Sequence, residues 1–257
     1  AYTYAPTAVT IFLAATATKV ALYVMMRVLY GVFPDGFVST TPTGDLFILS
    51  GLAGIISASF YAVYQTDVKR LLAYSSVAQI GYMALGIGLA SFLGLTAAVV
   101  HLFNHALMKG ALFMAVGALI FRVGSCQIDD IRGLGRRMPW TFGAIVIGGL
   151  SLVGVPLTAG FVSKWYLVTA ALSAGWWWLV PVIVLGSLLA VIYVWRVIEV
   201  VWFRPPNPAL AGHTEAPASL LLPTWGLALA NLYFGIDTSL TTGTTEAAAT
   251  ALFGGIR

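Results

Sequence analysis

The sequence predicts an all-α integral membrane protein with about seven transmembrane helices, and three observations lead to this fold class. The 257 residues are 60% hydrophobic and 9% charged, whereas soluble globular domains carry about 25% charged residues. The mean hydropathy is +0.93. Apolar stretches of roughly 20 residues, long enough to cross the hydrocarbon core, recur along the chain. They occupy residues 7–32, 45–65, 70–91, 94–121, 139–173, 177–203 and 217–235.

Turn and helix-breaking signals separate and interrupt these stretches. The second and third are divided by the polar turn QTDVKR, whose Asp67 is a candidate N-cap for the third helix. The fifth, 139–173, is too long for one simple crossing and contains GVPLTAGF. Pro156 cannot donate a backbone hydrogen bond, and Gly154 and Gly160 flank it. We therefore predict a helix that is discontinuous near Pro156, with these three residues as its break or gate.

The end of the chain is expected to be less ordered than the rest. The sixth stretch carries Arg196 and Glu199, which are spaced to pair and are assigned to structure. After the seventh stretch, DTSLTTGTTEAAATALFGGIR is small, polar and weakly patterned. Because no linker divides the chain, we expect one transmembrane domain over residues 1–236 and a loosely ordered tail over 237–257.

The positions of the basic residues predict the orientation of the chain. Lys and Arg fall in every second loop, and cytoplasmic loops carry an excess of these residues. We therefore expect a multi-pass protein of the cell inner (plasma) membrane, with the N-terminus of this chain cytoplasmic and its C-terminus external. The net charge of +4 reflects this topology and does not indicate a nucleic-acid partner. The basic loop residues are Lys69, Arg70, Arg122, Arg132, Arg136, Arg137 and Arg204.

The sequence contains no pattern that predicts a metal or a cofactor. Cys126 is the single cysteine, and no CxxC motif or Cys/His cluster accompanies it. The glycine-rich stretches suit close helix packing, and none resembles a phosphate-binding loop. We expect no cofactor, no metal, no redox chemistry and no catalytic site within this chain.

Three lysines lie inside the predicted helices. Lys19 is near the middle of the first stretch, Lys109 is near the middle of the fourth, and Lys164 follows the predicted break. A charged lysine costs at least ~2.5 kcal/mol at the centre of a bilayer, so each is expected to face protein or water. Purely structural or snorkelling lysines are the alternative, and for Lys164 this means a proline kink beside a side chain that reaches the interface.

The stretch VVHLFNHALMKGALFM places His101, His105 and Lys109 four residues apart. Steps of four advance about 40° beyond a full turn, so the three form a strip that rises about 12 Å along a helix. Imidazole can accept a proton on one nitrogen and release one from the other, so the strip predicts a proton path. Histidines that anchor helices by hydrogen bonds remain an alternative, as does a zinc site, although no acidic or cysteine ligand lies nearby.

Four motifs resemble those of a known family. They are TKVALYVMMR, QTDVKRLLAYSSVAQIGYM, HLFNHALMKGALFM and GVPLTAGFVSKWYL. In this order and spacing they resemble the antiporter-like proton-translocating subunits of respiratory complex I, membrane-bound hydrogenases and Mrp-type Na+/H+ antiporters. The resemblance extends to about residue 206, and RGLGRRMPWTFGAIVIGGLSLVGVPLTAGFVSKWYL followed by GSLLAVIYVWRVIEVVWFRPP is most similar to the D-type subunit of Mrp antiporters.

The resemblance implies a fold and residue roles. Family members contain two inverted five-helix repeats, and the second to sixth stretches would be the second repeat, flanked by the first and seventh. Lys19 would match the lysine that bridges two half-channels, Lys109 the central lysine, and Lys164 the lysine at the far end of the polar axis. His101 and His105 would match the histidines that hydrate and relay within it.

The first repeat of the family, with its glutamate–lysine ion pair, has no counterpart in this sequence. The chain begins AYTYAPTAV, similar to the end of the HxxAPT stretch of the family, with Tyr2 where histidine is usual. We expect either a fragment or a first half that is encoded separately. The expected partners are therefore the missing N-terminal half and other membrane subunits.

The resemblance implies a proton-conducting subunit of a multisubunit monovalent cation (Na+)/H+ antiporter. Protons would move along the Lys/His axis, with Na+ as the coupling ion in the Mrp type. The alternative is a proton-pumping antiporter-like subunit of NADH:quinone oxidoreductase (complex I) or of a membrane-bound hydrogenase. From another class, a receptor or a non-transporting membrane scaffold is disfavoured by the three lysines at membrane depth.

Overall fold

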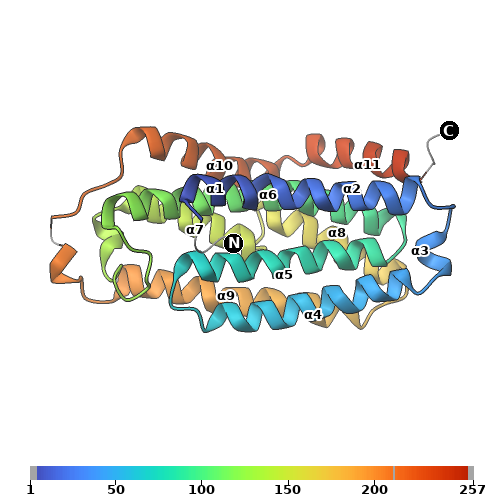
Figure 1. Ribbon diagram of the computed structural model, residues 1–257, viewed down its shortest axis with the longest axis horizontal. Coiled ribbons are helices and arrows are strands. Elements are labelled where there is room, and N and C mark those ends of the chain that lie inside the picture. Colours follow the sequence, from blue (N-terminus) through green and yellow to red (C-terminus); the bar gives the residue numbers. More distant parts are fainter. Residues whose placement is uncertain (1–4, 211, 254–257) are drawn as a thin grey trace.

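The computed structural model describes residues 5–210 and 212–253 as a bundle of helices that run side by side (Figure 1). Within these ranges the chain forms no β-strand, and Asp67 and Gln127 make an isolated β-bridge. The helices are α1 (Thr7–Phe12), α2 (Thr18–Gly31), α3 (Phe37–Thr40), α4 (Thr43–Val63), α5 (Val68–Gly88), α6 (Phe92–Val123), α7 (Pro139–Val153), α8 (Ala159–Ser173), α9 (Leu179–Phe203), α10 (Ala218–Ile236) and α11 (Ser239–Phe253), with a π-helical turn η1 (Leu13–Ala17) and 3₁₀ turns η2 (Leu134–Arg136) and η3 (Pro208–Leu210).

The predicted membrane fold is confirmed. In the described chain, six helical spans are long and apolar enough to cross a membrane. A seventh predicted crossing corresponds to α7 and α8, which have 15 residues each and together cover the long fifth stretch. The six spans are Thr7–Gly31, Thr43–Val63, Val68–Gly88, Phe92–Val123, Leu179–Phe203 and Ala218–Ile236.

Local signals in the sequence account for the helix ends. Asp67 caps α5, because its carboxylate accepts a hydrogen bond from the Arg70 backbone N–H at 2.8 Å, as predicted. Ser91 caps α6 in the same way, accepting from the Gly94 N–H at 3.1 Å. Gly124 ends α6 in the left-handed region at φ 75°, which a glycine adopts without a steric penalty.

The predicted break near Pro156 is present. Helix α7 ends at Val153, and Gly154 follows in the left-handed region at φ 88°. Helix α8 begins at Ala159, so five residues separate two half-length helices. Because each half has 15 residues, the break lies near the middle of the segment and leaves backbone groups without helical partners at membrane depth.

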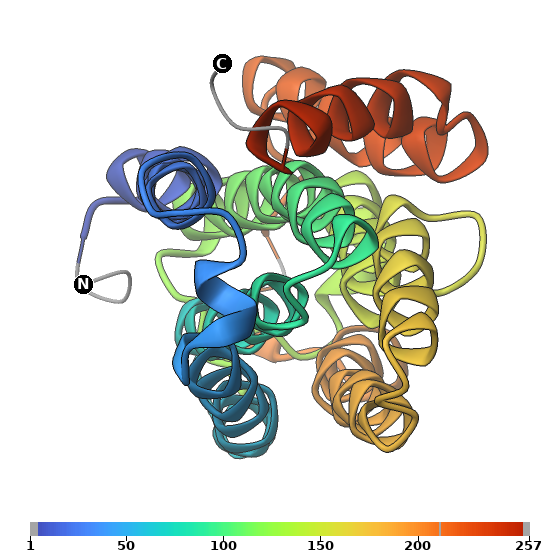
Figure 2. The ribbon, with the colours of Figure 1, turned by 90° about the vertical axis from the view of Figure 1, so that its right-hand side faces the viewer.

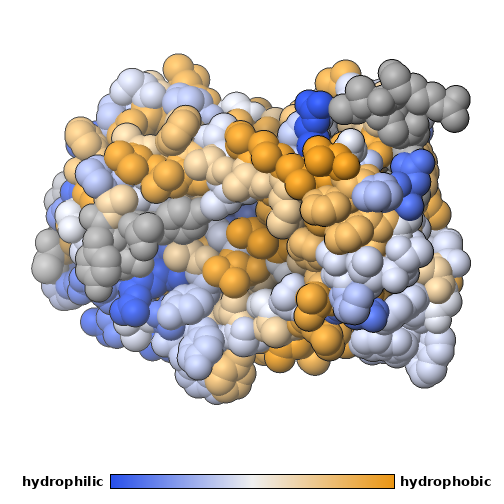
Figure 3. Space-filling view, turned by 45° about the vertical axis from the view of Figure 1, so that its right-hand side comes forward, coloured by the Kyte–Doolittle hydropathy of each residue, from blue (hydrophilic) through white to orange (hydrophobic). Residues whose placement is uncertain are grey.

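Helix α6 lies inside the bundle and packs against α5, α7, α8 and α10. In the end-on view, α10 and α11 run along one side next to α6, while α4 and α9 lie on the opposite side (Figure 2). Hydrophobic residues gather over the middle of the face shown in Figure 3, and hydrophilic residues lie mainly toward its two ends. This distribution matches a bundle that crosses a bilayer along its long axis.

The final segment differs from the expectation of a loosely ordered tail. Residues 239–253 form helix α11, which packs against α6 and α2. Ala249 and Leu252 are buried there in a cluster that includes Met83 and Leu95. The threonine- and alanine-rich sequence has no strong periodicity, so the packing that stabilises this helix was not evident from its pattern. Residues 254–257, and Tyr2 in the AYTYAPTAV start, lie outside the described residues.

Candidate functional site

The three lysines singled out in the sequence are buried, and each lies on a different membrane-spanning segment. Lys19 is on α2, Lys109 on α6 and Lys164 on α8, with exposed fractions of 4%, 0% and 6%. Among the described residues, Arg204 forms an ion pair with Glu199. No carboxylate in this part of the chain pairs with any of the three lysines. Their ammonium groups must therefore be stabilised by neutral dipoles.

Lys109 is held by α5. Its Nζ donates to the Leu72 carbonyl oxygen at 2.8 Å and to Ser75 Oγ at 2.5 Å. The same Nζ lies 5.9 Å from the centre of the Phe113 ring, within the range of a cation–π contact. Both acceptors are uncharged, so Lys109 can lose its proton without leaving an unpaired buried carboxylate.

The histidine strip is present as predicted. The rings of His101 and His105 lie nearly parallel, with centroids 6.1 Å apart and an interplanar angle of 10°. His101 Nδ1 lies 2.7 Å from Ser163 Oγ on α8. His101 Nε2 and both ring nitrogens of His105 are buried and have no hydrogen-bond partner among the described residues. Buried polar atoms without a protein partner are usually satisfied by ordered water, so the strip is suited to a hydrated path.

Lys164 is held by the end of the broken helix. Its Nζ donates to the carbonyl oxygens of Leu152 at 3.1 Å and Val153 at 2.8 Å. These carbonyls are free because α7 stops at Val153, and they carry the negative end of its dipole. Ser187 Oγ on α9 accepts a third hydrogen bond at 2.9 Å. The break thus creates the site that stabilises this ammonium group.

Tyr82 connects Lys164 to the histidines. Lys164 Nζ lies 4.8 Å from the centre of the Tyr82 ring, and that ring meets His101 edge-on at 5.7 Å. Asn104 also ties the strip to the break, since its Nδ2 donates to the Ala159 carbonyl oxygen at 2.6 Å. The strip on α6 and the lysine on α8 therefore belong to one buried polar cluster.

Lys19 follows the π-helical turn η1. Its Nζ donates to the Ala14 carbonyl oxygen within that turn, and Thr18 Oγ1 lies 3.5 Å away. In the described chain Lys19 makes no hydrogen bond to His101, His105 or Lys109. The structure thus connects Lys164, His101 and His105 through the Tyr82 ring, the Ser163 hydroxyl group and the stacked imidazole rings. Lys19 lies on a separate helix, α2.

The three residues assigned to the break occupy different positions in it. Gly154 is the left-handed residue after α7, and a Cβ there would lie 2.9 Å from the Cδ of Lys164. Pro156 lies in the linker between the half-helices. Gly160 is in the first turn of α8, where its N–H donates to Ser151 Oγ at 3.2 Å. The break is therefore packed against the polar cluster.

Several polar residues of the cluster are not evident from the sequence. Short hydroxyl and amide side chains are common in membrane helices, so a single one does not indicate a functional site. A signal was nevertheless present, because Ser75, Gln79 and Tyr82 recur at helical spacing on α5 and share one face. The residues missed are Ser75, Gln79, Tyr82, Ser163, Ser187 and Tyr193.

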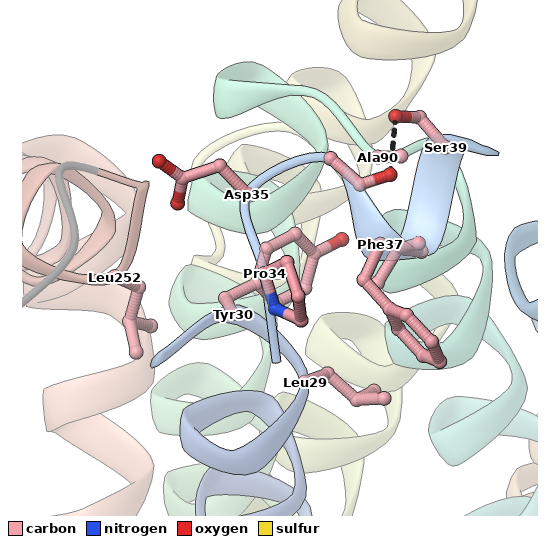
Figure 4. Close-up of a pocket in the computed structure, with 10 residues that line it drawn as sticks. Leu29, Tyr30, Pro34, Asp35, Phe37, Ser39, Ala90 and Leu252 are labelled. Atoms are coloured by element: carbon pink, nitrogen blue, oxygen red, sulfur yellow. Dashed lines mark hydrogen bonds between the residues drawn. The ribbon is translucent and has the colours of Figure 1, made fainter. Parts of the chain in front are cut away.

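Two cavities lie at the surface of the bundle, one beside the lysine and histidine cluster and one away from it. A groove of about 350 Å³ between α8 and α9 reaches Lys164. A cavity of about 210 Å³ lies between the end of α2 and α3, at the end of the bundle whose predicted loops lack Lys and Arg (Figure 4). Tyr30 and Asp35 are among the residues that line it, and its described lining includes no basic side chain.

The described residues contain no cluster of three or more His, Cys, Asp or Glu side chains that could hold a metal ion. His101 and His105 therefore have no third ligand of these types within that part of the chain. The single cysteine, Cys126, lies in the loop after α6, where its Sγ is 3.1 Å from an Asp67 carboxylate oxygen. Burial and this carboxylate raise the pKa of the thiol to about 12.

Comparison with known proteins identifies the family. The sequence pattern of the family described as "NADH:quinone oxidoreductase/Mrp antiporter, TM" matches residues 1–190, which is most of the chain. The chain belongs to this family. The resemblance drawn from the four motifs is therefore confirmed.

Relatives of this chain include subunits of respiratory membrane complexes. NADH-quinone oxidoreductase subunit N of Desulforudis audaxviator is 40% identical over 248 residues, which cover 92% of this chain and 49% of that protein. A chain of the membrane-bound sulfane sulfur reductase, an archaeal respiratory membrane complex, superposes with a TM-score of 0.83 at 33% identity, covering 98% of this chain and 50% of that one.

The fold is also shared with a chain of an Mrp complex. A chain of the Mrp complex from a Dietzia species superposes with a TM-score of 0.89 at 24% identity, covering 98% of this chain and 54% of that one. At this identity the similarity establishes the fold alone. The chain spans about half the length of the curated family members it matches.

Proposed function

We propose that this chain is the proton-conducting half of an antiporter-like subunit in a redox-driven membrane complex of the NADH:quinone oxidoreductase type. The observation that carries the proposal is the buried cluster of Lys109, His105, His101 and Lys164, stabilised by neutral dipoles. Groups that exchange protons, held without fixed counter-charges, can change protonation state inside a membrane at tolerable cost.

Protons would move along the cluster in short steps. Lys109 exchanges a proton with His105 through water, since the histidine nitrogens have no described protein partner. Water between the two rings would carry it on to His101 Nε2, and His101 Nδ1 is hydrogen-bonded to Ser163 Oγ. Lys164 receives it beside the free carbonyls of α7. Lys19 would supply the connection toward the other half of the subunit.

The break at Gly154, Pro156 and Gly160 would act as the gate of this path. Movement of α8 relative to α7 would change how many carbonyl oxygens face Lys164, and hence how tightly it holds a proton. This role rests on the position of the break beside the lysine. The gate would then consist of the backbone carbonyl groups of Leu152 and Val153, which remain when a side chain is substituted.

The relatives favour the redox-linked alternative over the Na+/H+ antiporter that the resemblance to the D-type Mrp protein implies. The relative at 40% identity is a NADH-quinone oxidoreductase subunit, whereas the similarity to the Mrp complex, at 24% identity, concerns the fold.

We further propose the assembly and orientation. The partners are the N-terminal half of the same subunit and other membrane subunits, because the matched relatives are about twice as long and belong to complexes. The end of the bundle that carries the basic loops faces the cytoplasm, with the N-terminus of this chain on that side and its C-terminus external. In a bacterial or archaeal cell this membrane is the plasma membrane.

The test is Lys109→Ala in the assembled complex, reconstituted into vesicles. Loss of Lys109 removes the central proton-binding group, so redox-driven acidification should fall at least about tenfold. A tenfold change in rate corresponds to the free energy of about one charge-assisted hydrogen bond. Arg122→Gln is the control, because Arg122 is exposed at the end of α6. Unchanged acidification in a fully assembled Lys109→Ala complex would refute the proton path.

A second measurement separates the two antiporter-like functions. Proton movement that is driven by a quinone reductase substrate and is independent of Na+ supports the redox-linked function. Proton movement that requires a Na+ gradient, with no response to the redox substrate, would instead support the Na+/H+ antiporter.

A further inference from the structure

A cleft of about 640 Å³ opens at the end of the bundle where α9 finishes. It lies far from the lysine and histidine cluster and plays no part in the proton path. Guanidinium groups, two aromatic side chains and two prolines surround it. Its lining residues are Gly133, Arg136, Arg137, Trp202, Phe203, Arg204, Pro205 and Pro206.

The cleft is fixed by backbone contacts that the loop before η2 makes with the end of α9 and with the loop after α9. The Gly133 N–H donates to the Val200 carbonyl oxygen at 3.1 Å, and the Asn207 N–H donates to the Arg132 carbonyl oxygen at 3.2 Å. A Cβ on Gly133 would overlap the backbone of Pro206, so the two loops touch. The walls are therefore held in place before any ligand arrives.

The charge of the cleft suits an anion. Three arginines line it, and the described acidic partner is Glu199, whose carboxylate lies 3.2 Å from an Arg204 nitrogen. Arg136 and Arg204 are exposed, so their guanidinium groups can reach a ligand. The planar guanidinium group matches the geometry of a phosphate and can bind it through two parallel hydrogen bonds.

The cleft also lies at the predicted boundary of the membrane. Trp178 and Trp202 mark the two ends of α9 and are separated by about 36 Å along the helix, close to the thickness of a bilayer. Tryptophan prefers the boundary between headgroups and hydrocarbon. Phe203, which is 71% exposed, extends the apolar surface of α9 up to the cleft.

We propose that this cleft binds the headgroup phosphate of an anionic phospholipid whose acyl chains lie along α9. The arginines provide the charge, and the apolar surface of α9 provides the contact that a free phosphate ion would lack. The cavity at the opposite end of the bundle has no basic residue in its described lining (Figure 4). The site would therefore select lipid from one leaflet.

The test compares two double variants of the assembled complex in nanodiscs of phosphatidylcholine with phosphatidylglycerol. Arg136→Gln with Arg204→Gln removes two charges from the cleft, and Arg70→Gln with Arg122→Gln removes two exposed charges from the same end of the bundle. We expect the first variant to retain at least about tenfold less tightly bound phosphatidylglycerol by mass spectrometry, and the second to match the parent complex.

Two outcomes would overturn the proposal. Equal retention of phosphatidylglycerol by both variants and the parent would show that the cleft does not hold lipid. Displacement of the bound phosphatidylglycerol by inorganic phosphate alone would show a site for a free anion. Arg136→Lys keeps the positive charge and loses the planar guanidinium group. Partial retention of phosphatidylglycerol by this variant would support phosphate binding by the guanidinium group, and it would also show that the substituted complex is folded.

Discussion

Each of the three buried lysines is held by backbone carbonyl oxygens, and none by a carboxylate among the described residues. A carboxylate would fix the lysine as a cation, because proton loss would leave a buried negative charge unpaired. A carbonyl oxygen accepts a hydrogen bond from either the charged or the neutral amine, so both forms are tolerated. The acceptors are Ala14 for Lys19, Leu72 for Lys109, and Leu152 and Val153 for Lys164.

Cys126 provides a prediction at the scale of one residue. Its pKa is raised to about 12 by burial and by the Asp67 carboxylate, so the thiol stays protonated from neutral to mildly alkaline pH. Because the thiolate is the reactive form, maleimide labelling should be at least about a hundredfold slower at pH 8.5 than for a cysteine of ordinary pKa. Its rate should keep rising with pH up to 10 without a plateau.

The control for this experiment is Arg122→Cys combined with Cys126→Ser, which moves the thiol to an exposed position at the end of α6. Its labelling rate should level off near pH 9, where an ordinary cysteine is mostly ionised. A plateau near the same pH for the native Cys126 would contradict the raised pKa.

At the scale of elements, the break between α7 and α8 does more than interrupt a helix. It exposes the carbonyl groups that hold Lys164, and it brings Gly154 against the side chain of that lysine. A continuous helix would satisfy the same carbonyls internally and leave the ammonium group without acceptors. The interruption and the lysine are thus parts of one site.

Gly154→Ala tests this coupling. Gly154 has φ 88°, which costs a residue with a Cβ about 1–2 kcal/mol, and the new Cβ would lie 2.9 Å from Lys164 Cδ. Gly124→Ala is a matched control, since Gly124 has φ 75° after α6 and a Cβ there would meet no atom within 4 Å. Both variants should lose similar thermal stability, and Gly154→Ala alone should lose most of its proton transport.

If both glycine variants transported protons equally well after equal loss of stability, the contact with Lys164 would have no functional role. A shift of the pH dependence of transport in Gly154→Ala, absent from Gly124→Ala, would show that the lysine itself had been disturbed. This readout separates the site from a general loss of stability.

Some features of these helices could be predicted from the sequence, and others could not. Apolar length predicts the spans, and Pro156 with Gly154 predicts the break, because both depend on backbone chemistry that is local. The partners of the lysines could not be predicted, since Ser75 and Ser187 are separated from Lys109 and Lys164 along the chain and meet them only after packing. Helix α11 was missed for the same reason, because its order depends on contacts with α6 and α2.

At the scale of the whole molecule, the two ends of the bundle differ in charge. One end holds Lys69 in the first turn of α5, Arg136 in η2 and Arg204 after α9, and the other holds Asp35 and a cavity without basic residues in its described lining. The lysine and histidine cluster lies between them, beside the break that divides the fifth segment. A bundle of this kind has a preferred orientation in the membrane, which decides the side from which protons enter.

Single cysteines at the two ends test that orientation. In a Cys126→Ser background, Ser39→Cys places a thiol on exposed helix α3, and Arg122→Cys places one at the end of α6. A membrane-impermeant maleimide added to intact cells should label Ser39→Cys, and it should label Arg122→Cys only after the membrane is opened. The reverse pattern would invert the proposed topology, and labelling of both from outside would mean that these two ends do not lie on opposite sides of the membrane. Since the basic loops that set the orientation also form the arginine cleft, the expected pattern would place the lipid site in the cytoplasmic leaflet, where anionic lipids attract basic residues.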